Sequence, residues 1–257
     1  MAQRLGQEIS LFCQDRDIET RIVQNDLQTK QIKVEPNLDL VIVVGGDGTL
    51  LSVARKIKGV PFLGINSGRL GFWTELNPEN WSKGLDQILD GQFKLSPRLK
   101  LAYSIPELAE QGEAINDLVL HRTGLARLLE LEVEVGAKKS FVVRADGVIL
   151  FTPTGSTAYN LSAHGAICYP ELRVFGINFI CPFLSLAPKL LFPESTKLRV
   201  ILHSDQIDAM LTVDGQKGIV LRKEVKIDIM SSSSDFILVQ KQDFNFIDKL
   251  QEKKILE

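Results

Sequence analysis

A glycine-rich run at residues 45–49 places a carboxylate in an unusual setting. The run reads Gly-Gly-Asp-Gly-Thr and follows a continuous apolar segment, residues 40–44. Glycines let the backbone bring its N–H groups close to a ligand, and a following helix would add the positive end of its dipole, so the run predicts phosphate binding. A carboxylate beside phosphates repels them unless it accepts a hydroxyl proton or helps to hold a metal ion, and both are kinase roles. The alternative is a tight strand-to-helix turn, which would leave Asp47 unexplained.

A second run, at residues 152–162, combines hydroxyl groups, glycine and small side chains. Residues 152–156 predict a turn that opens a helix, on which Tyr159 and Ser162 share one face. The small residues 156–158 would let a flat base approach the backbone, and Tyr159 could pack on that base. The alternative is a capped helix that docks on a sheet.

Neither the P-loop pattern GxxxxGK[ST] nor the dinucleotide pattern GxGxxG occurs in the chain. The segment GGDGTLL at residues 45–51 resembles the nucleotide loop shared by NAD kinases, diacylglycerol and sphingosine kinases and, more distantly, phosphofructokinases. The segment DGVILFTPTGSTAY at residues 146–159 is similar to the NAD kinase signature over its whole length. Residues 66–72, 116–117 and 213–216 resemble further segments of that family.

The resemblance implies an NAD kinase, which transfers the γ-phosphoryl group of ATP, or a phosphoryl group of polyphosphate, to the adenosine 2′-hydroxyl of NAD and makes NADP. Asp47 would accept the proton of that hydroxyl. The phosphates of ATP would lie on Gly45, Gly46, Gly48 and Thr49, with Mg²⁺ or Mn²⁺ carried on the phosphates and no separate protein metal site. The implied NAD contacts are Asp47, Gly48, Phe72, Asn116, Asp117, Arg127, Arg144, Asp146, Thr157, Ala158, Tyr159, Asn160, Leu161, Ser162 and Gln216.

The chain departs from the family pattern at several positions. Asp117 stands where the family usually has glutamate, which shortens the ribose-binding side chain by one methylene. His164 and Ala166 replace small or proline residues, and Phe183, Leu184 and Ala187 replace polar ones. The strand that opens the family's first βα unit is not visible ahead of the first predicted helix. No role is assigned to His121, His164 or His203, because none has a partner at metal-ligand spacing.

The secondary structure predicted to position these residues changes along the chain, from alternating helices and strands to strands alone. Apolar residues at helical spacing predict helices near residues 5–12, 49–57 and 81–89, and strands are expected at 19–23, 40–44 and 60–65, with Thr49 as a helix N-cap. From residue 93 onward, alternating segments such as 129–135 predict strands. The expected architecture is an α/β N-terminal Rossmann-like domain over residues 1–92, an all-β NAD-binding domain over 93–234, and a closing strand and helix over 235–257 that returns to the first domain.

Composition narrows the class of protein. The 257 residues include 30 basic and 32 acidic side chains, for a net charge of −2, and 44% are hydrophobic. This near-neutral balance argues against binding nucleic acid or a membrane surface through bulk charge. Cys13, Cys168 and Cys181 form no CxxC pair, and no signal peptide or transmembrane segment is visible, so a reducing cytoplasm is expected.

The partners expected are therefore the small molecules NAD and ATP, together with further copies of the same chain, because the family forms homodimers and homotetramers and places its active site between the two domains. Two alternatives stay open. A lipid kinase that shares the GGDGT loop would need an apolar acyl-chain pocket. A non-catalytic NAD or nucleotide sensor would fit the loss of polar groups at residues 183–187.

Overall fold

The computed structural model describes residues 1–23, 38–68, 71–124, 127–136, 139–183, 187–203, 209–222 and 224–256. The chain forms two compact units. Unit 1 combines Met1–Pro97 with Phe236–Glu257, and unit 2 is Arg98–Asp235. The chain therefore passes from one unit to the other twice, and the C-terminal segment belongs with the N-terminal one.

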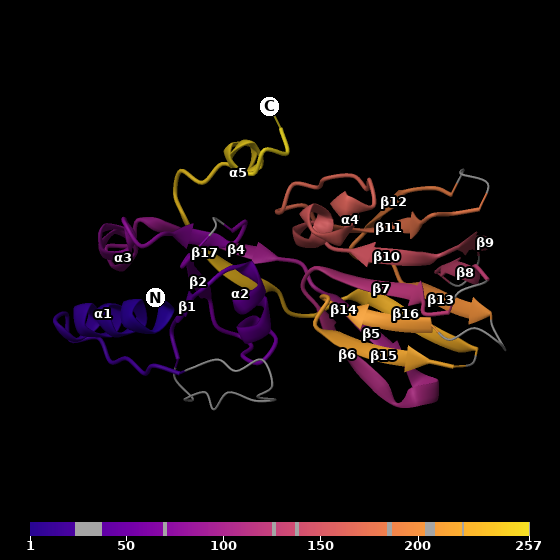
Figure 1. Cartoon of the computed structure of the whole chain (residues 1–257), viewed down its shortest axis with the longest axis horizontal. Coiled ribbons are helices and arrows are strands. Elements are labelled where there is room, and N and C mark those ends of the chain that lie inside the picture. The colour runs from indigo at the N-terminus through magenta and orange to yellow at the C-terminus, as the bar shows by residue number, and fades with distance from the viewer. Residues whose placement is uncertain are drawn as a thin grey trace. The chain divides into compact units, whose positions relative to one another are not determined.

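Unit 1 is built around a mixed α/β layer whose sheet has the strand order β1-β2-β17-β4, with β3 paired to β2 (Figure 1). Strands β1, β3 and β17 all run parallel to β2. The elements are α1 (Ala2–Gln14), β1 (Val41–Val44), α2 (Asp47–Ala54), β2 (Phe62–Ile65), β3 (Thr74–Leu76), α3 (Trp81–Leu89), β4 (Phe93–Arg98), β17 (Phe236–Lys241) and α5 (Phe246–Glu252).

Helices cover both faces of strand β2. Leu63 and Ile65 pack in one core cluster with residues of α1 and α3, including Leu5 and Leu85. Between them, Gly64 points to the opposite face, where a Cβ would lie only 2.8 Å from Leu50 of α2. A parallel strand covered on both faces explains why the neighbouring strands read as continuous apolar runs.

Unit 2 is a sandwich of two antiparallel sheets, each six-stranded in the described residues. One sheet has the order β12-β11-β10-β7-β14-β15 and the other β6-β5-β16-β13-β8-β9. The elements are β5 (Leu101–Ile105), η1 (Pro106–Leu108), β6 (Glu110–Ala114), β7 (Asp117–Arg122), β8 (Leu129–Val135), β9 (Lys139–Ala145), β10 (Gly147–Phe151), η2 (Thr154–Thr157), α4 (Tyr159–Ser162), β11 (Val174–Ile180), β12 (Leu190–Pro193), β13 (Leu198–His203), β14 (Ala209–Val213), β15 (Lys217–Leu221) and β16 (Val225–Ser231).

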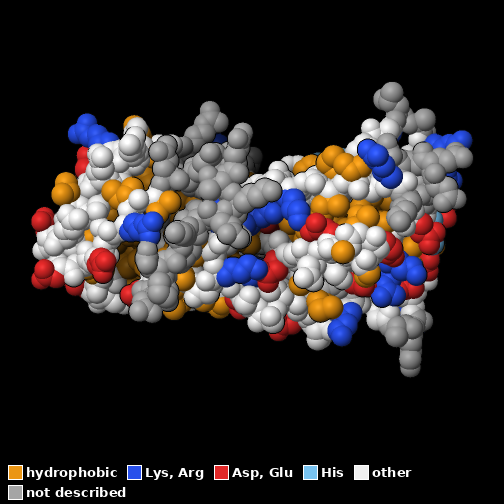
Figure 2. Space-filling view, turned by 90° about the horizontal axis from the view of Figure 1, so that it is seen from below, with side chains coloured by type: hydrophobic (Ala, Val, Ile, Leu, Met, Phe, Trp, Pro, Cys, Tyr) orange, Lys and Arg blue, Asp and Glu red, His pale blue; other side chains and the backbone are white. Residues whose placement is uncertain are grey.

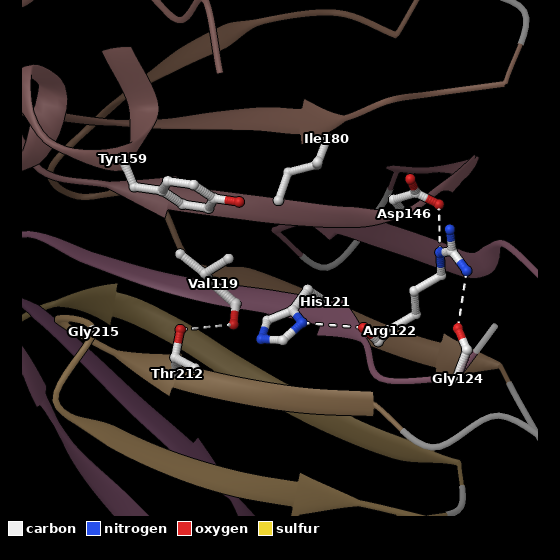
Figure 3. Close-up of a pocket in the computed structure, with 9 residues that line it drawn as sticks. All are labelled: Val119, His121, Arg122, Gly124, Asp146, Tyr159, Ile180, Thr212 and Gly215. Carbon is white, nitrogen blue, oxygen red and sulfur yellow. Dashed lines mark hydrogen bonds and ion pairs between the residues drawn. The ribbon is translucent and has the colours of Figure 1, made fainter. Parts of the chain in front are cut away.

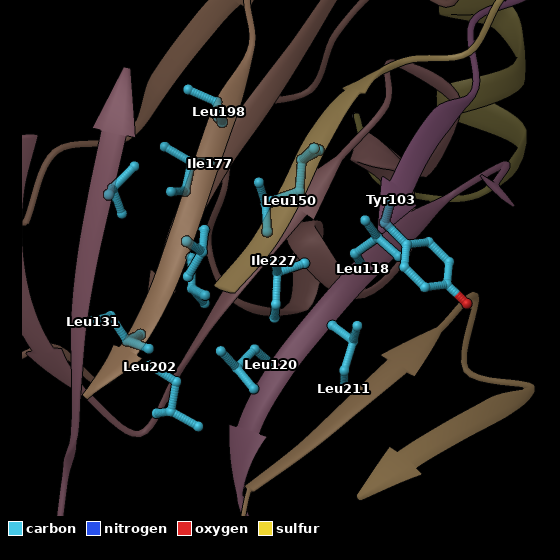
Figure 4. Packing of buried hydrophobic residues seen from close by; sticks show 14 of the residues in the cluster. Tyr103, Leu118, Leu120, Leu131, Leu150, Ile177, Leu198, Leu202, Leu211 and Ile227 are labelled. Atoms are coloured by element: carbon cyan, nitrogen blue, oxygen red, sulfur yellow. The ribbon is translucent and has the colours of Figure 1, made fainter. Parts of the chain in front are cut away.

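The core of unit 2 lies between its two sheets. Leu118 and Leu120 of β7 face Leu131 of β8 and Ile227 of β16 in one buried cluster (Figure 4). On β8 the leucines and valines point into this core, while Glu132 and Glu134 on the other face pair with His203 and Arg199. The strict alternation predicted for residues 129–135 is thus explained by one buried and one polar sheet face.

The fold class predicted from the sequence is confirmed: an α/β first part, a β-rich second part and a closing helix. Two local predictions are wrong. Residues 19–23 form no strand, and helix α2 begins at Asp47 with Gly46, rather than Thr49, as its N-cap. The helix expected after residue 156 is present as the four residues of α4, preceded by the 3₁₀ turn η2.

Two further observations concern the charged side chains on the surface and the length of the helices. On the face seen in Figure 2, basic and acidic side chains are interspersed. In the part of the chain that the structure describes, no helix is both long and apolar enough to cross a membrane.

Candidate functional site

Backbone N–H groups of a neighbouring loop hold the side chain of Asp47 in place. Strand β1 ends at Val44, and Gly46 takes an extended conformation that starts helix α2 at Asp47 itself. The Asp47 carboxylate accepts hydrogen bonds from two consecutive N–H groups, those of Phe72 (2.6 Å to Oδ2) and Trp73 (3.0 Å to Oδ1). The carboxylate is half-buried. These bonds set its orientation and leave it with lone pairs for other donors.

The loop that holds Asp47 depends on a glycine. A Cβ at Gly71 would lie 2.0 Å from Asp47 Oδ1, which is impossible without displacing the carboxylate. The N–H of Gly71 donates to Thr74 Oγ1 at 3.0 Å, so the loop is also tied to strand β3. Arg69 and Leu70, in the same predicted segment, lie outside the described residues.

The glycines of the run differ in how closely other atoms pack against them. A Cβ at Gly45 would collide with Thr49 at 2.8 Å, whereas a Cβ at Gly46 or Gly48 would meet no atom of the described residues within 4 Å. Among the described residues, the backbone at Gly46 and Gly48 therefore has open space beside it. Together with the start of α2, this space can admit an anion close to the Asp47 carboxylate.

In unit 2, the carboxylate of Asp214 binds the backbone of the predicted pair Asn116–Asp117. Asp214, in the turn after β14, accepts from the N–H groups of Ile115 (3.0 Å), Asn116 (2.7 Å) and Asp117 (3.2 Å). The N–H of Asp214 in turn donates to the carbonyl of Asp117 at 2.9 Å. Two segments that lie about a hundred residues apart are thereby joined at the start of strand β7.

The hydroxyl-rich turn that begins at Thr152 binds to the same stretch of backbone, at Ile115. Thr152 is fully buried, donates its hydroxyl to the carbonyl of Ile115 at 2.6 Å and accepts from the N–H of Gly155 at 3.0 Å. A Cβ at Gly155 would lie 2.0 Å from the carbonyl oxygen of Asn116. The structure therefore brings together three segments that the sequence singled out separately: residues 116–117, 152–159 and 213–216.

Polar atoms at this junction remain available to a ligand. Among the described residues, Asn116 Oδ1 and Thr154 Oγ1 are buried side-chain atoms without a hydrogen-bond partner. Asp117 is only 4% exposed, and this burial, together with the nearby Asp214 carboxylate, raises its pKa to about 7. Buried polar atoms are normally paired, so this cluster is suited to a ligand that brings its own donors and acceptors.

A pocket of about 600 Å³ lies beside the cluster, on the sheet face that β7, β10 and β14 form (Figure 3). Tyr159 closes one side of it with a half-exposed ring. Arg122 Nε and Asp146 Oδ1, 2.6 Å apart, form an ion pair at the other side. The lining residues are Val119, His121, Arg122, Gly124, Asp146, Tyr159, Ile180, Thr212 and Gly215.

Among these lining residues, only Asp146, Tyr159 and Gly215 belong to segments that the sequence predicts for the site. Val119 and His121 could have been found from strand alternation, because they share a face with Asp117 on β7. Arg122, Ile180 and Thr212 could not have been found, since their places depend on the pairing of β10 with β7 and β11 and of β7 with β14.

The remaining predicted residues lie in different surroundings. Asn160 is buried, and its amide donates to the carbonyls of Ser156 and Ala166 and accepts from Asn178. Arg144 is exposed and lies over the ring of Phe183, with Cζ 5.5 Å from the ring centre, rather than beside Asp146. Of the others, Arg127, Ser162 and Gln216 are exposed, and Thr157, Ala158 and Leu161 are half-buried.

Comparison with known proteins gives matches along the whole chain. Residues 1–93 match the family model of the ATP-NAD kinase N-terminal domain, and residues 115–241 match that of the ATP-NAD kinase C-terminal domain. An NAD kinase of Lawsonia intracellularis is 31% identical over 261 residues, covering 99% of this chain and 92% of the relative. An NAD kinase of Magnetococcus marinus is 38% identical over 222 residues, covering 84% and 73%.

Two solved structures are similar to this fold. The NAD kinase from Archaeoglobus fulgidus in complex with ATP superposes with a TM-score of 0.80 at 25% identity, covering 98% of this chain and 95% of that one. Yeast NADH kinase complexed with NADH superposes with a TM-score of 0.77 at 28% identity, covering 86% and 67%.

Proposed function

This chain belongs to the NAD kinase family, and from that premise we propose that Asp47 accepts the proton of the adenosine 2′-hydroxyl of NAD as a phosphoryl group arrives from ATP. The chain is an NAD kinase, and the product is NADP. The assignment of Asp47 depends on one observation: two backbone N–H groups hold its carboxylate in one orientation within the glycine run of residues 45–48.

Phosphoryl transfer asks the protein mainly for positioning and charge neutralisation. The Asp47 carboxylate, already oriented by Phe72 and Trp73, needs only to lie within hydrogen-bond reach of the 2′-hydroxyl to accept its proton. We assign the triphosphate to the open space beside Gly46 and Gly48, where N–H groups and the start of α2 favour an anion. Gly45 and Thr49 pack on each other and shape that loop.

We assign a ribose of NAD to Asn116 and Asp117. The unpaired Asn116 Oδ1 can accept from one hydroxyl group. Asp117, with a pKa of about 7, is present near neutral pH both as an acceptor and as a carboxylic acid that can donate. This dual character offsets the shorter side chain, because a vicinal diol both donates and accepts. Asp47 belongs to unit 1 and Asn116 to unit 2.

The other NAD contacts are assigned on the family resemblance together with their positions. Tyr159 and Asp146 line the pocket, and Phe72 and Gly48 lie next to Asp47. Asn160 is assigned a positioning role, because its amide is occupied within the protein. Arg127, Arg144, Thr157, Ala158, Leu161, Ser162 and Gln216 complete the proposed set. In this scheme residues 1–92 bind the ATP phosphates and residues 93–234 bind NAD, with residues 235–257 closing the first part.

We propose that a divalent ion, Mg²⁺ or Mn²⁺, arrives with ATP. Within the described residues no group of three or more acidic, histidine or cysteine side chains could hold a metal ion. Binding through substrate phosphates and few protein carboxylates is usual for Mg²⁺. When bound, such an ion would neutralise phosphate charge. Polyphosphate as an alternative donor, a homodimer or homotetramer, and a cytoplasmic location are proposed on the same resemblance.

The function is tested by incubating the protein with NAD and ATP in the presence of Mg²⁺. The expected product is NADP phosphorylated at the adenosine 2′-hydroxyl, identified by ³¹P NMR. Chelation with EDTA should stop its formation and added Mg²⁺ or Mn²⁺ should restore it. Tight NAD binding without any product under either metal ion would contradict the proposal and favour a non-catalytic sensor.

A further inference from the structure

The pocket of unit 2 carries two opposite charges at one side. Arg122 donates from Nε to Asp146 Oδ1 at 2.6 Å and from Nη1 to the carbonyl of Gly124 at 2.9 Å. Both side chains of the pair are 30% exposed, so the pair faces the pocket rather than the core. Figure 3 shows the pair across the pocket from the ring of Tyr159. The other titratable groups of the lining are Tyr159 and His121, and His121 Nδ1 lies 3.1 Å from the carbonyl oxygen of Arg122.

The chemistry of NAD indicates which of its rings suits this pocket. NAD has two flat rings, adenine and nicotinamide, and only the nicotinamide carries an amide. A pocket of about 600 Å³ with a tyrosine ring at its side and polar groups opposite is suited to a flat ring that carries an amide.

The oxidised and reduced dinucleotides differ at this ring by one positive charge. A carboxylate nearby attracts the charged nicotinamide of NAD, whereas a guanidinium group repels it, and neither acts strongly on the neutral ring of NADH. While Arg122 and Asp146 are paired, their effects on the ring largely cancel. Resting on the function proposed above, we propose that the pairing of Arg122 with Asp146 keeps either charge from shifting the preference of this enzyme between NAD and NADH.

The test measures kcat/KM for NAD and for NADH, with ATP and Mg²⁺, in single variants of the pair. Arg122→Gln leaves the carboxylate unneutralised and should shift the NAD/NADH ratio of kcat/KM toward NAD by roughly fivefold, the factor that about 1 kcal/mol of charge interaction represents. Asp146→Asn leaves the guanidinium unneutralised and should shift the ratio by a similar factor toward NADH. Because the readout is a ratio, a general loss of activity in either variant does not hide the effect.

Further variants separate charge from structure. Arg122→Lys keeps the positive charge and should keep the wild-type ratio, and the double variant Arg122→Gln with Asp146→Asn should return close to it. The matched control is Arg199→Gln with Asp228→Asn, since that pair has the same 2.6 Å separation between Nε and Oδ1 but lies on β13 and β16 of the other sheet. Its ratio should equal that of the wild type.

Ratios that stay unchanged in both single variants, or that move in the same direction, would overturn the inference. An unchanged ratio is the result expected if the adenine, which is the same in both dinucleotides, occupies the pocket. Failure of the proposed function looks different, because the wild-type protein would then form neither NADP nor NADPH.

Discussion

The carboxyl group of Asp117 is buried beside a second carboxyl group, that of Asp214. Burial is the larger cause and the negative charge of Asp214 the smaller, and together they raise the pKa of Asp117 from 3.8 to about 7. The folded state therefore holds a proton on Asp117 that the unfolded chain releases near pH 4. Over the window from about pH 4 to about pH 7, this group makes the protein less stable as the pH rises.

Replacing Asp117 with asparagine removes this dependence while keeping the size of the side chain. We expect Asp117→Asn to gain stability relative to the wild type between pH 4.5 and pH 8, on the order of a few kcal/mol. Urea unfolding of both proteins at the two pH values measures the gain. A stability difference that is equal at both pH values would show that Asp117 does not hold its proton in the folded state.

Gly71 is required by the carboxylate that packs against it. In Gly71→Ala the new Cβ would lie 2.0 Å from Asp47 Oδ1 and would push the carboxylate off the N–H groups of Phe72 and Trp73. A displacement of this size should lower kcat on the order of 10- to 100-fold with NAD and ATP. Gly68→Ala is the control, because a Cβ there meets no atom within 4 Å in the part of the chain that the structure describes. Equal activity of the two variants would contradict this role of the loop.

For single residues, the sequence predicted which side chains are functional more successfully than it predicted the contacts of those side chains. Asp47 and Tyr159 could be singled out because a carboxylate among glycines and an aromatic ring after a hydroxyl-rich turn have few purely structural explanations. The contact between Asp47 and residues 72–73 could not be predicted, since it joins segments that become neighbours only when β2 and β3 pair. The Arg122–Asp146 pair was missed for a similar reason.

Among the elements, strand β10 and the turn after it position the predicted ribose site through Thr152. In Thr152→Val the shape is kept, but the buried carbonyl of Ile115 and the N–H of Gly155 each lose a partner. The expected cost is about 1–3 kcal/mol in the free energy of unfolding, and KM for NAD should rise because Asn116 is bound to the same backbone.

Chemical denaturation and steady-state kinetics measure the two effects of Thr152→Val. Thr152→Ser, which keeps the hydroxyl, should recover most of both. If the serine variant behaves like the valine variant, then the hydroxyl bonds are not what holds the turn.

Element types followed from periodicity where one face is buried, as on β8. The predictions of helix boundaries were less successful, because the conformation of single residues determines where these helices begin and end. Helix α2 starts three residues earlier than expected because Gly46, rather than Thr49, is its N-cap and takes an extended conformation, which puts Asp47 in the first helical position. The helix at residues 159–162 is a single turn because His164 takes a left-handed conformation (φ 56°) and the N–H of Gly165 bonds to the carbonyl of Asn160.

For the whole molecule, the two units have separate cores and carry separate parts of the proposed chemistry. Asp47 and the glycine run belong to unit 1, whereas Asn116, Asp117 and the pocket belong to unit 2. Binding of NAD and transfer of the phosphoryl group should therefore be separable by mutation. This separation would not be expected if Asp47 were mainly a structural residue or the main anchor of NAD.

The most direct measurement uses Asp47→Asn, assayed for NADP formation from NAD and ATP and, in parallel, for NAD affinity by isothermal titration calorimetry. The account predicts that turnover falls by at least about 100-fold, as expected for the loss of a general base, while the Kd for NAD stays close to that of the wild type. An Asp47→Asn variant that turns over normally, or one that loses turnover only because it no longer binds NAD, would contradict the assignment of Asp47 as the group that accepts the proton.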